Sequence, residues 1–496
     1  MQIPFDNRYA ALGGRFYVKT NPAPVADPAL IAFNDELARE MGFQVDGMDA
    51  GELAAVFSGN RVPDGAEPVA LAYAGHQFGH FVPQLGDGRA ILLGEVRAPD
   101  GRRFDMHLKG SGRTDFSRGG DGRAALGPVL REYLVSEAMA KLGVPTTRAL
   151  AAVTTGEQVM RDRPLPGAVI TRVASSLVRV GTFQYFASRG DVEATRTLAD
   201  YVIERNYPSV AEAPNPYAAL LQAVIDRQAS LIAQWMQLGF IHGVMNTDNM
   251  SVAGETIDYG PCAFMDAYAH DRVYSSIDRG GRYAYGNQPS IGLWNLTRLA
   301  ETLLPVLADD AQAAVELAQD VLKTYAARFE KEWLAGMRAK CGLAGESGDG
   351  SEEDDRMLVE ALLNTMAANN ADYTLTFFHL SQLDAGSDVK DQAVRGLFDE
   401  PARFDDWAIA WRRRVSGQGM SDAARQARMR AVNPVYIPRN HRIEAAIRAA
   451  EDHGDFTPFH DLHAVLRNPY VRQDGRDGYM LPPEPHEIVE QTFCGT

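Results

Sequence analysis

Three side chains near the middle of the chain have the types and spacing that suit a metal ion bound to phosphate. Asp248 and Asn249 end the run His-Gly-Val-Met-Asn-Thr-Asp-Asn, and Asp258 opens the run Asp-Tyr-Gly shortly afterwards. Carboxylate and amide oxygens are the ligands that hard divalent cations such as Mg²⁺ and Mn²⁺ prefer. This arrangement therefore predicts that Asn249 and Asp258 bind a divalent metal ion that also holds the phosphates of a nucleotide.

The spacing from His242 to Asn249, and onward to Asp258, matches two segments of the protein-kinase fold. There, the Asn of His-x-Asp-x-x-x-x-Asn and the Asp of Asp-Phe-Gly hold the metal ions that bridge the phosphates of ATP. One position departs from the pattern, because the kinase base would stand at Val244, which accepts no proton. Asp248 is a carboxylate nearby. A run such as Asn-Thr-Asp-Asn also suits an ordinary turn, so the loop alone leaves a chance match open.

Upstream segments in the order of a kinase N-terminal lobe favour the nucleotide site. A kinase places a glycine turn over the phosphates, then a lysine on a strand, then a glutamate on a helix that pairs with this lysine. This chain has a glycine-containing turn at 86–89, Lys109 at the end of an alternating stretch, and Glu132 in a helical pattern. Glu137 fits the same periodicity, so the pattern leaves the partner of Lys109 open. The glycine turn, the lysine, the glutamate and the later loop are each a weak signal. All four in the order found in kinases are much less probable by accident than any one of them alone.

The elements that must position these residues form a mixed first part and a mostly helical second part. The apolar run at 90–96, which follows the glycine-containing turn, and the alternating residues at 104–108 predict two strands. A glycine-rich loop follows over 110–127. Pro128 and Gly143 are typical of the start and the end of a helix. We therefore expect an α+β chain with a protein-kinase-like two-lobed fold, whose N-terminal lobe spans residues 1–165.

Residues 166–496 are expected to form the second lobe and a helical C-terminal extension. Apolar residues recur at helical spacing in 191–206, in 216–238 and through much of 290–340. The acidic, glycine-rich stretch 345–355 predicts a solvated loop between two helical blocks.

Charge and hydropathy exclude several classes of protein. The chain has 496 residues and a net charge of −16, which argues against a nucleic-acid-binding face. No uncharged apolar run approaches the ~18 residues of a membrane helix, and the N-terminus lacks the pattern of a signal peptide. The three cysteines, Cys262, Cys341 and Cys494, are widely spaced. Such sparse cysteines suit a reducing compartment, so we expect a cytoplasmic enzyme with no nucleic-acid or membrane partner.

Several long motifs resemble the selenoprotein O family. They cover nearly the whole chain and occur at 73–79, 107–114, 242–250, 433–434 and 436–441. Membership in this family would imply a pseudokinase fold that transfers AMP from ATP to Ser, Thr or Tyr hydroxyls of proteins, with self-modification as a further outcome. The resemblance also implies that ATP binds in a flipped orientation, which presents its α-phosphate to the acceptor.

The resemblance implies a role for each matching residue. Lys109 and Glu132 should form the ion pair, Asp248 should act as the base, and Asn249 and Asp258 should bind Mg²⁺ or Mn²⁺. The nucleotide should be lined by the following residues: Gly86, Gly88, Arg89, Asp121 and Gly122. Its phosphates should be held by Arg172 and Arg179. Guanidinium groups match phosphate oxygens bidentately, which suits a reaction that releases pyrophosphate.

Three alternatives remain open at this point. The first is ordinary phosphoryl transfer, with Asp248 in place of the base missing at Val244. The second is a non-catalytic nucleotide-binding scaffold. The third is a thiol-redox protein, since many members of the resembled family end in a Cys-x-x-Cys or Cys-x-x-selenocysteine motif. Here Cys494 has no such neighbour, and we expect a free thiol there, with a pairing to Cys262 as the alternative.

Overall fold

A large antiparallel sheet dominates the first part of the chain in the computed structural model, which describes residues 3–44, 47–343 and 351–492. In spatial order the main strands are β1 (Tyr17–Lys19), β3 (Val69–Leu71), β6 (Ala90–Arg97), β7 (Arg103–Lys109), β10 (Pro164–Ala174), β9 (Arg148–Met160) and β2 (Ala29–Phe33). The short β8 (Ala124–Ala125) pairs with β10. The strands predicted at 90–96 and 104–108 are confirmed as β6 and β7. Both are almost wholly buried, including the polar side chains of Glu95, Asp105 and His107.

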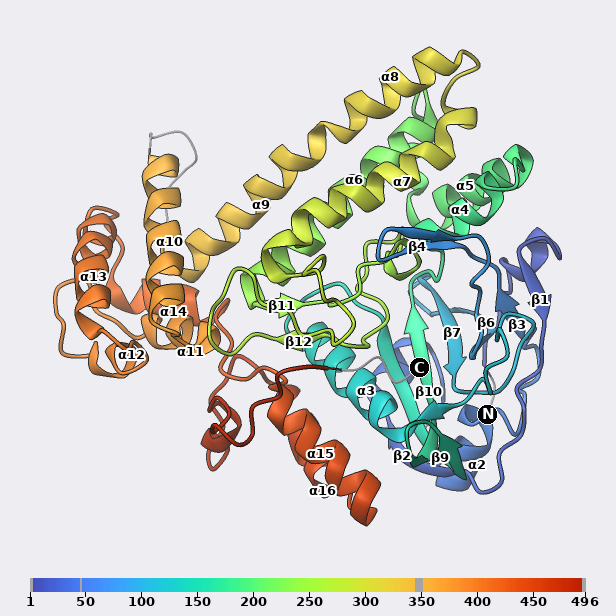
Figure 1. The fold of residues 1–496 in the computed structure, drawn as a ribbon, viewed down its shortest axis with the longest axis horizontal. Helices are drawn as coiled ribbons and strands as arrows, with labels where there is room; N and C mark the ends of the chain where they lie inside the picture. The colour runs from blue at the N-terminus through green and yellow to red at the C-terminus, as the bar shows by residue number, and fades with distance from the viewer. Residues whose placement is uncertain (1–2, 45–46, 344–350, 493–496) are drawn as a thin grey trace.

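Helix α3 (Leu126–Lys141) packs on this sheet, and two C-terminal helices cover its other side (Figure 1). These are α15 (Asn440–His453) and α16 (Thr457–Leu466). The helix predicted to start at Pro128 starts two residues earlier and ends just before Gly143, whose φ of +84° suits glycine. Because α3 is covered on both sides, nearly all of its residues are buried, including Glu132 and Glu137.

The rest of the chain is mainly helical. Helices α6 (Pro216–Leu238), α7 (Gln288–Leu307) and α9 (Thr324–Lys340) run side by side (Figure 1). The predicted span 216–238 is confirmed, because Asn215 caps the first turn and Gly239 closes the last in a left-handed conformation. The other helices are α1 (Asp35–Glu40), α2 (Ala50–Phe57), α4 (Val180–Ala187), α5 (Val192–Asn206), α8 (Ala311–Leu322), α10 (Ser351–Ala368), α11 (Tyr373–Leu380), α12 (Gln392–Arg395), α13 (Pro401–Ser416) and α14 (Asp422–Arg430). Small two-stranded sheets pair β4 (Gly75–Gln77) with β5 (His80–Val82) and β11 (Phe240–Ile241) with β12 (Ala263–Phe264).

The prediction of a loop over 345–355 is wrong for its last residues. Helix α10 begins at Ser351, and residues 344–350 lie outside the described part of the chain. Acidic residues in a first helical turn interact favourably with the positive end of the helix dipole, so an acidic run is compatible with a helix start. Asp355 is fully buried and pairs with Arg338 and Arg414 at 2.8 and 2.7 Å. These two arginines come from other helices, which a local pattern cannot reveal.

The expected lobe boundary between residues 165 and 166 falls within β10. This strand continues to Ala174 and lies between β7 and β9 in the sheet. The sheet therefore extends past residue 165. Among the described residues, no helix is both long enough and apolar enough to cross a bilayer.

Lys340, at the end of α9, is buried without a carboxylate partner among the described residues. Its side chain lies 4.5 Å from the ring centre of Phe377 and 5.8 Å from that of Tyr373. Only 3% of the residue is exposed. Burial lowers the pKa of Lys340 to about 7, whereas an unfolded chain holds this proton up to about pH 10.4. Below pH 7 both states carry the charge, so its burial costs the most stability there.

We therefore expect Lys340→Met to raise the midpoint of thermal unfolding at pH 7, and expect the gain to shrink toward pH 10. Each unit of pKa difference corresponds to about 1.4 kcal/mol. The measurement is scanning calorimetry at pH 7 and at pH 9.5. Lys331→Met, at an exposed position of the same helix, is the control and should change little. A lower midpoint for Lys340→Met at pH 7 would show that contacts with the two rings outweigh the cost of burial.

Candidate active site

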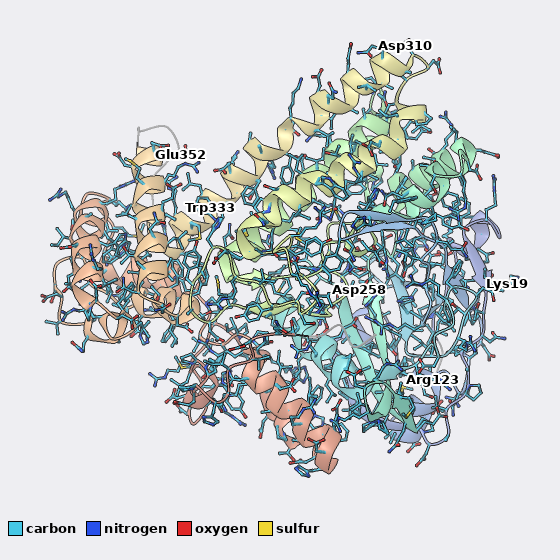
Figure 2. All side chains as sticks on the ribbon, viewed as in Figure 1. Lys19, Arg123, Asp258, Asp310, Trp333 and Glu352 are labelled. Atoms are coloured by element: carbon cyan, nitrogen blue, oxygen red, sulfur yellow. The ribbon has the colours of Figure 1, made fainter. Side chains whose placement is uncertain are left out.

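Two carboxylates and three cations meet where the sheet adjoins the helical part of the chain. Glu132 on α3 accepts a hydrogen bond from Lys109 at 2.7 Å and from Arg172 at 2.6 Å. Asp258 is contacted by Lys109 at 3.2 Å, Arg172 at 2.5 Å and Arg179 at 3.0 Å. Figure 2 shows Asp258 between the strands and the long helices. The structure thus brings together the predicted Lys109–Glu132 pair, both predicted phosphate-binding arginines and Asp258.

The choice between the two glutamates of α3 follows from these contacts. Glu132 faces Lys109, whereas Glu137 pairs with Arg148 at 2.7 Å and accepts a hydrogen bond from the backbone N–H of Ala149. Helical periodicity places both residues on a buried side of the helix. Only the strands that pack against α3 decide which glutamate meets the lysine.

The charges of this cluster favour an anion. Burial by itself raises the pKa of Asp258, but Arg172, Arg179 and Lys109 outweigh it and hold this pKa well below its usual range. Lys109, Arg172 and Arg179 contact only two carboxylates, those of Asp258 and Glu132, so this mostly buried set of ion pairs carries one positive charge before the nearby Asp248 is counted. Since buried charge requires a partner, the cluster is suited to phosphate oxygens.

Asp248 lies beside this cluster, in a single 3-10 turn that spans Thr247–Asn249. Its backbone oxygen accepts a hydrogen bond from Arg179 at 2.9 Å, and its Oδ2 accepts one from Gln77 Nε2 at 3.3 Å. Its Oδ1 is buried and has no hydrogen-bond partner among the described residues. Burial raises the pKa of Asp248 to about 6, against the opposing effect of Arg179. A side-chain Cβ at Gly75 would stand 2.5 Å from Oδ1, so β4 approaches Asp248 this closely only with glycine there.

Asn249 is oriented by the loop that contains it. Its Nδ2 donates to the backbone oxygen of Val244 at 3.0 Å, which leaves Oδ1 as the atom available to a cation. His242 is buried, and its Nε2 donates to the backbone oxygen of Ile257, next to Asp258, at 2.9 Å. This contact links the loop to the segment that carries Asp258. Asp258 itself has a φ of +64°, an uncommon conformation for a residue other than glycine.

The predicted glycine turn is held by a neighbouring loop. Thr114 Oγ1 donates to the backbone oxygen of Asp87 at 2.6 Å, and Ser117 donates to that of Gly88. A Cβ at Gly86 would stand 2.2 Å from the Phe116 ring, so only glycine fits there. The turn closes a long connection between β3 and β6 and is not a two-residue hairpin.

The other residues predicted to line the nucleotide are Arg89, at the end of this turn, and Asp121 and Gly122, on the glycine-rich loop. The backbone oxygen of Arg89 accepts a hydrogen bond from Gly110 at 2.7 Å. Asp121 pairs with Arg161 at 2.8 Å, and a Cβ at Gly122 would overlap the backbone of Gly112. Their contact with a nucleotide remains a prediction.

Two residues of the site were missed by reasoning on types and spacing. Gln77 contacts Asp248, and the ring of Tyr73 lies 4.6 Å below the Arg179 guanidinium. Both belong to the run 73–79, which carried the family resemblance. That run was the one signal available, since neither residue type has a spacing rule that links it to the loop at 242–249.

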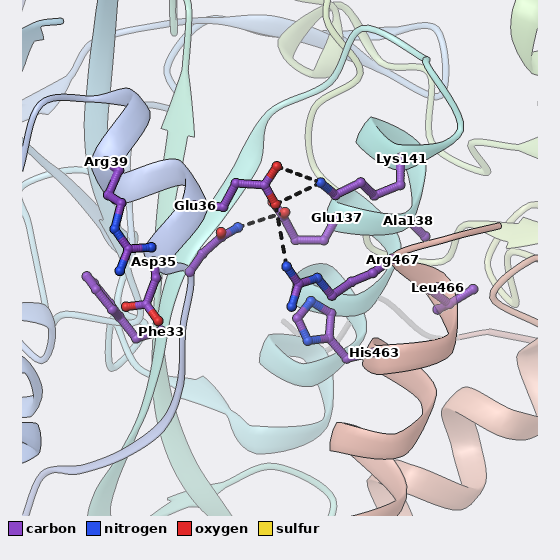
Figure 3. A pocket seen from close by; sticks show the side chains of 11 residues that line it. Phe33, Asp35, Glu36, Arg39, Glu137, Ala138, Lys141, His463, Leu466 and Arg467 are labelled. Atoms are coloured by element: carbon purple, nitrogen blue, oxygen red, sulfur yellow. Dashed lines mark hydrogen bonds and ion pairs between the residues drawn. The ribbon is translucent and has the colours of Figure 1, made fainter. Parts of the chain in front are cut away.

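The cysteines and a separate cavity lie outside this cluster. Cys262 and Cys341 are buried. Cys494 lies outside the described residues, as does its predicted free state or pairing with Cys262. A cavity of about 200 Å³ is lined mainly by residues of α1, α3 and α16. Figure 3 shows the side chains that line it. Its Lys141 is neutralised by Glu36 at 2.8 Å. None of the predicted site residues lines this cavity.

Comparisons with known proteins agree along the whole chain. A family model described as "Protein adenylyltransferase SelO" matches residues 1–467. The chain is 61% identical over 497 residues to the protein nucleotidyltransferase YdiU of Rhodopseudomonas palustris strain BisB5, with 100% of both chains covered. It is 59% identical over 492 residues to the YdiU protein of Rhizobium etli, with 99% of this chain and 97% of that protein covered. It is 58% identical over 496 residues to that of a Bradyrhizobium species, with 100% of both covered.

Proposed function

Because this chain belongs to the SelO family of protein adenylyltransferases, we propose that it transfers AMP from ATP to hydroxyl side chains of proteins and releases pyrophosphate. The observation that carries the proposal is the convergence of Lys109, Arg172 and Arg179 on Asp258, beside the buried Asp248. Sparse cysteines and a net charge of −16 support protein substrates in a reducing cytoplasm, and not nucleic acid.

The proposed fold is that of a two-lobed, protein-kinase-like enzyme with a helical C-terminal extension. The sheet and α3 would form the first lobe, with the Lys109–Glu132 pair inside it. We propose that the lobe boundary follows Ala174, the last residue of β10. Helices α15 and α16 would then belong to the extension that holds α3, and with it Glu132, in place.

In the proposed reaction, the acceptor oxygen attacks the α-phosphorus of ATP. The bond between that phosphorus and the oxygen that bridges the α- and β-phosphates breaks. Asp248 accepts the proton of the hydroxyl, while Lys109, Arg172 and Arg179 stabilise the departing pyrophosphate. A flipped nucleotide would place the α-phosphate toward Asp248. The nucleotide would be lined by these residues: Gly86, Gly88, Arg89, Asp121 and Gly122.

Asn249 Oδ1 and Asp258 fit a phosphate-bound cation. Among the described residues, no group of three or more His, Cys, Asp or Glu could hold a metal ion. Two oxygen ligands from the protein suit Mg²⁺ or Mn²⁺ when phosphates supply others. Such a cation, when bound, would neutralise phosphate charge.

We expect α-labelled ATP to label the chain itself or an added protein, and γ-labelled ATP to label neither. The bond broken in AMP transfer leaves the α-phosphate on the acceptor and both outer phosphates in pyrophosphate. The measurement is radiolabel in protein bands after incubation with each nucleotide and Mg²⁺ or Mn²⁺. A sample with chelator and no added metal serves as the control.

The two rival functions give different outcomes in this assay. Label from γ-ATP alone would indicate phosphoryl transfer, with Asp248 as its base. Measurable ATP binding with neither label transferred would indicate a non-catalytic scaffold. Intact-mass analysis of the product gives an independent answer, because AMP and phosphate differ greatly in mass.

A further inference from the structure

The hairpin formed by β4 and β5 rests directly on the loop that contains Asp248. Its residue His76 donates a backbone hydrogen bond to Thr247 Oγ1 at 2.7 Å, and Phe78 donates one to Asn246 Oδ1 at 3.1 Å. Gln77, between them, donates to Asp248 itself. The side chains beside this hairpin are therefore close to the proposed base.

An aromatic and cationic surface adjoins this hairpin, and we define it by five residues: His76, Phe81, Arg282, Trp294 and Arg298. The His76 ring lies 5.0 Å from that of Phe81 and 5.2 Å from that of Trp294. The Arg282 and Arg298 guanidinium groups lie 4.7 and 5.1 Å from the Trp294 ring centre. Phe81 is 40% exposed although it is aromatic. We call this surface the Arg–Trp patch.

The arginines of the patch are partly exposed. Arg282 makes no ion pair among the described residues, and its buried Nε atom has no hydrogen-bond partner there, so the rest of its guanidinium group is the part that a ligand could reach. Arg298 pairs with the half-exposed Glu301 at 2.7 Å, and its side chain is about a quarter exposed. Burial lowers the pKa of His76, and Arg298 and Arg282 contribute to this effect against the opposing Gln184. With Glu301 counted against Arg298, Arg282 leaves the patch one net positive charge on a chain of net charge −16.

We propose that the Arg–Trp patch binds the acceptor segment of the protein substrate and selects segments with acidic side chains beside the acceptor hydroxyl. This inference rests on the proposed function and names its substrate class. Guanidinium forks bind carboxylates in a bidentate geometry. Exposed aromatic rings with arginine are typical of the residues that dominate protein interfaces. Asp248, whose buried Oδ1 has no hydrogen-bond partner in the described part of the chain, is contacted by Gln77, the residue that follows His76 in the hairpin.

The net charge of the chain adds to the selectivity of the patch. An acidic substrate is repelled by most of a surface whose net charge is −16. A patch with two arginines near the base therefore distinguishes substrates by where their acidic residues lie. It favours acidic residues that stand beside the reacting hydroxyl, and not those elsewhere in the substrate. Substrate proteins without such residues would gain nothing from the patch.

The test uses three short peptides with one acceptor residue, flanked on both sides by glutamate, glutamine or lysine. Fluorescence anisotropy measures binding, and α-labelled ATP measures transfer. We expect the glutamate peptide to exceed the lysine peptide roughly fivefold to tenfold in both affinity and kcat/KM. The double change Arg282→Gln and Arg298→Gln should remove this preference, and Arg298→Glu should reverse it. The control Arg196→Gln also removes an arginine that lies over an aromatic ring, here Tyr217, outside the patch.

The two readouts separate the patch from the reaction. Equal binding and equal transfer for all three peptides would overturn the inference while leaving AMP transfer intact. A binding preference that depends on the two arginines supports the patch even if no label is transferred, an outcome that would count against the proposed reaction. If a single-stranded oligonucleotide displaces the glutamate peptide and binds the patch more tightly, the protein-acceptor assignment is wrong.

Discussion

Replacing Asp258 by alanine is expected to abolish both AMP transfer and the metal-dependent part of ATP binding. Asp258 is the carboxylate predicted to bind the metal ion, and it is held by Lys109, Arg172 and Arg179. The substitution removes the predicted metal ligand. It also removes the carboxylate that Lys109, Arg172 and Arg179 all contact. The measurements are ATP affinity with and without Mg²⁺ or Mn²⁺, and label transferred from α-labelled ATP.

Loss of folding must be separated from loss of chemistry in this variant. Removing one partner of a buried ion pair typically costs about 3–5 kcal/mol. Asp258→Asn, which keeps the shape of the side chain, should lose activity with a smaller loss of stability. Asp266→Asn is a matched control, since Asp266 pairs with the buried Arg439 outside the site. Undiminished activity of Asp258→Ala at equal metal concentration would rule out its assigned role.

Replacing Asp248 by alanine is expected to lower turnover by ~10²–10⁴-fold, the usual contribution of a general base, and to leave ATP affinity largely intact. No other carboxylate occurs between His242 and Asn249. Asn249→Ala should instead weaken metal and nucleotide binding together. The measurements are turnover and ATP affinity, both in the presence of metal.

The stability of the Asp248 variants gives a second criterion. Because Oδ1 is buried without a hydrogen-bond partner among the described residues, the carboxylate carries a desolvation cost that the fold does not recover. Asp248→Asn should therefore unfold at an equal or higher temperature, although its turnover falls. Such a combination is typical of a residue kept for function. If Asp248→Ala lost ATP binding as severely as Asp258→Ala, its role would be structural or linked to the metal, and the assignment as base would be wrong.

The order of the site segments and several element boundaries follow from the sequence by itself. Helix α6 is bounded by Asn215 and Gly239, and the strand that ends at Lys109 follows from alternating apolar residues. These features were predictable because capping, left-handed glycine and strand alternation act between residues that are near one another in the chain. Residue type and spacing led to the further prediction that Asn249 and Asp258 are oxygen ligands of a metal ion, since ligand chemistry depends on residue type.

Which of these residues meet was decided by the tertiary structure. Periodicity could not choose between Glu132 and Glu137, and nothing local relates Gln77 to Asp248 or Arg172 to Asp258. The start of α10 was also misjudged, because Asp355 is compensated by arginines of α9 and α13. A charged side chain in an interior gains stability only from partners that packing brings within a few ångströms. The sequence determines which groups the site contains. Long-range packing determines which of them form the mostly buried cluster of ion pairs, and it leaves Oδ1 of Asp248 without a hydrogen-bond partner among the described residues.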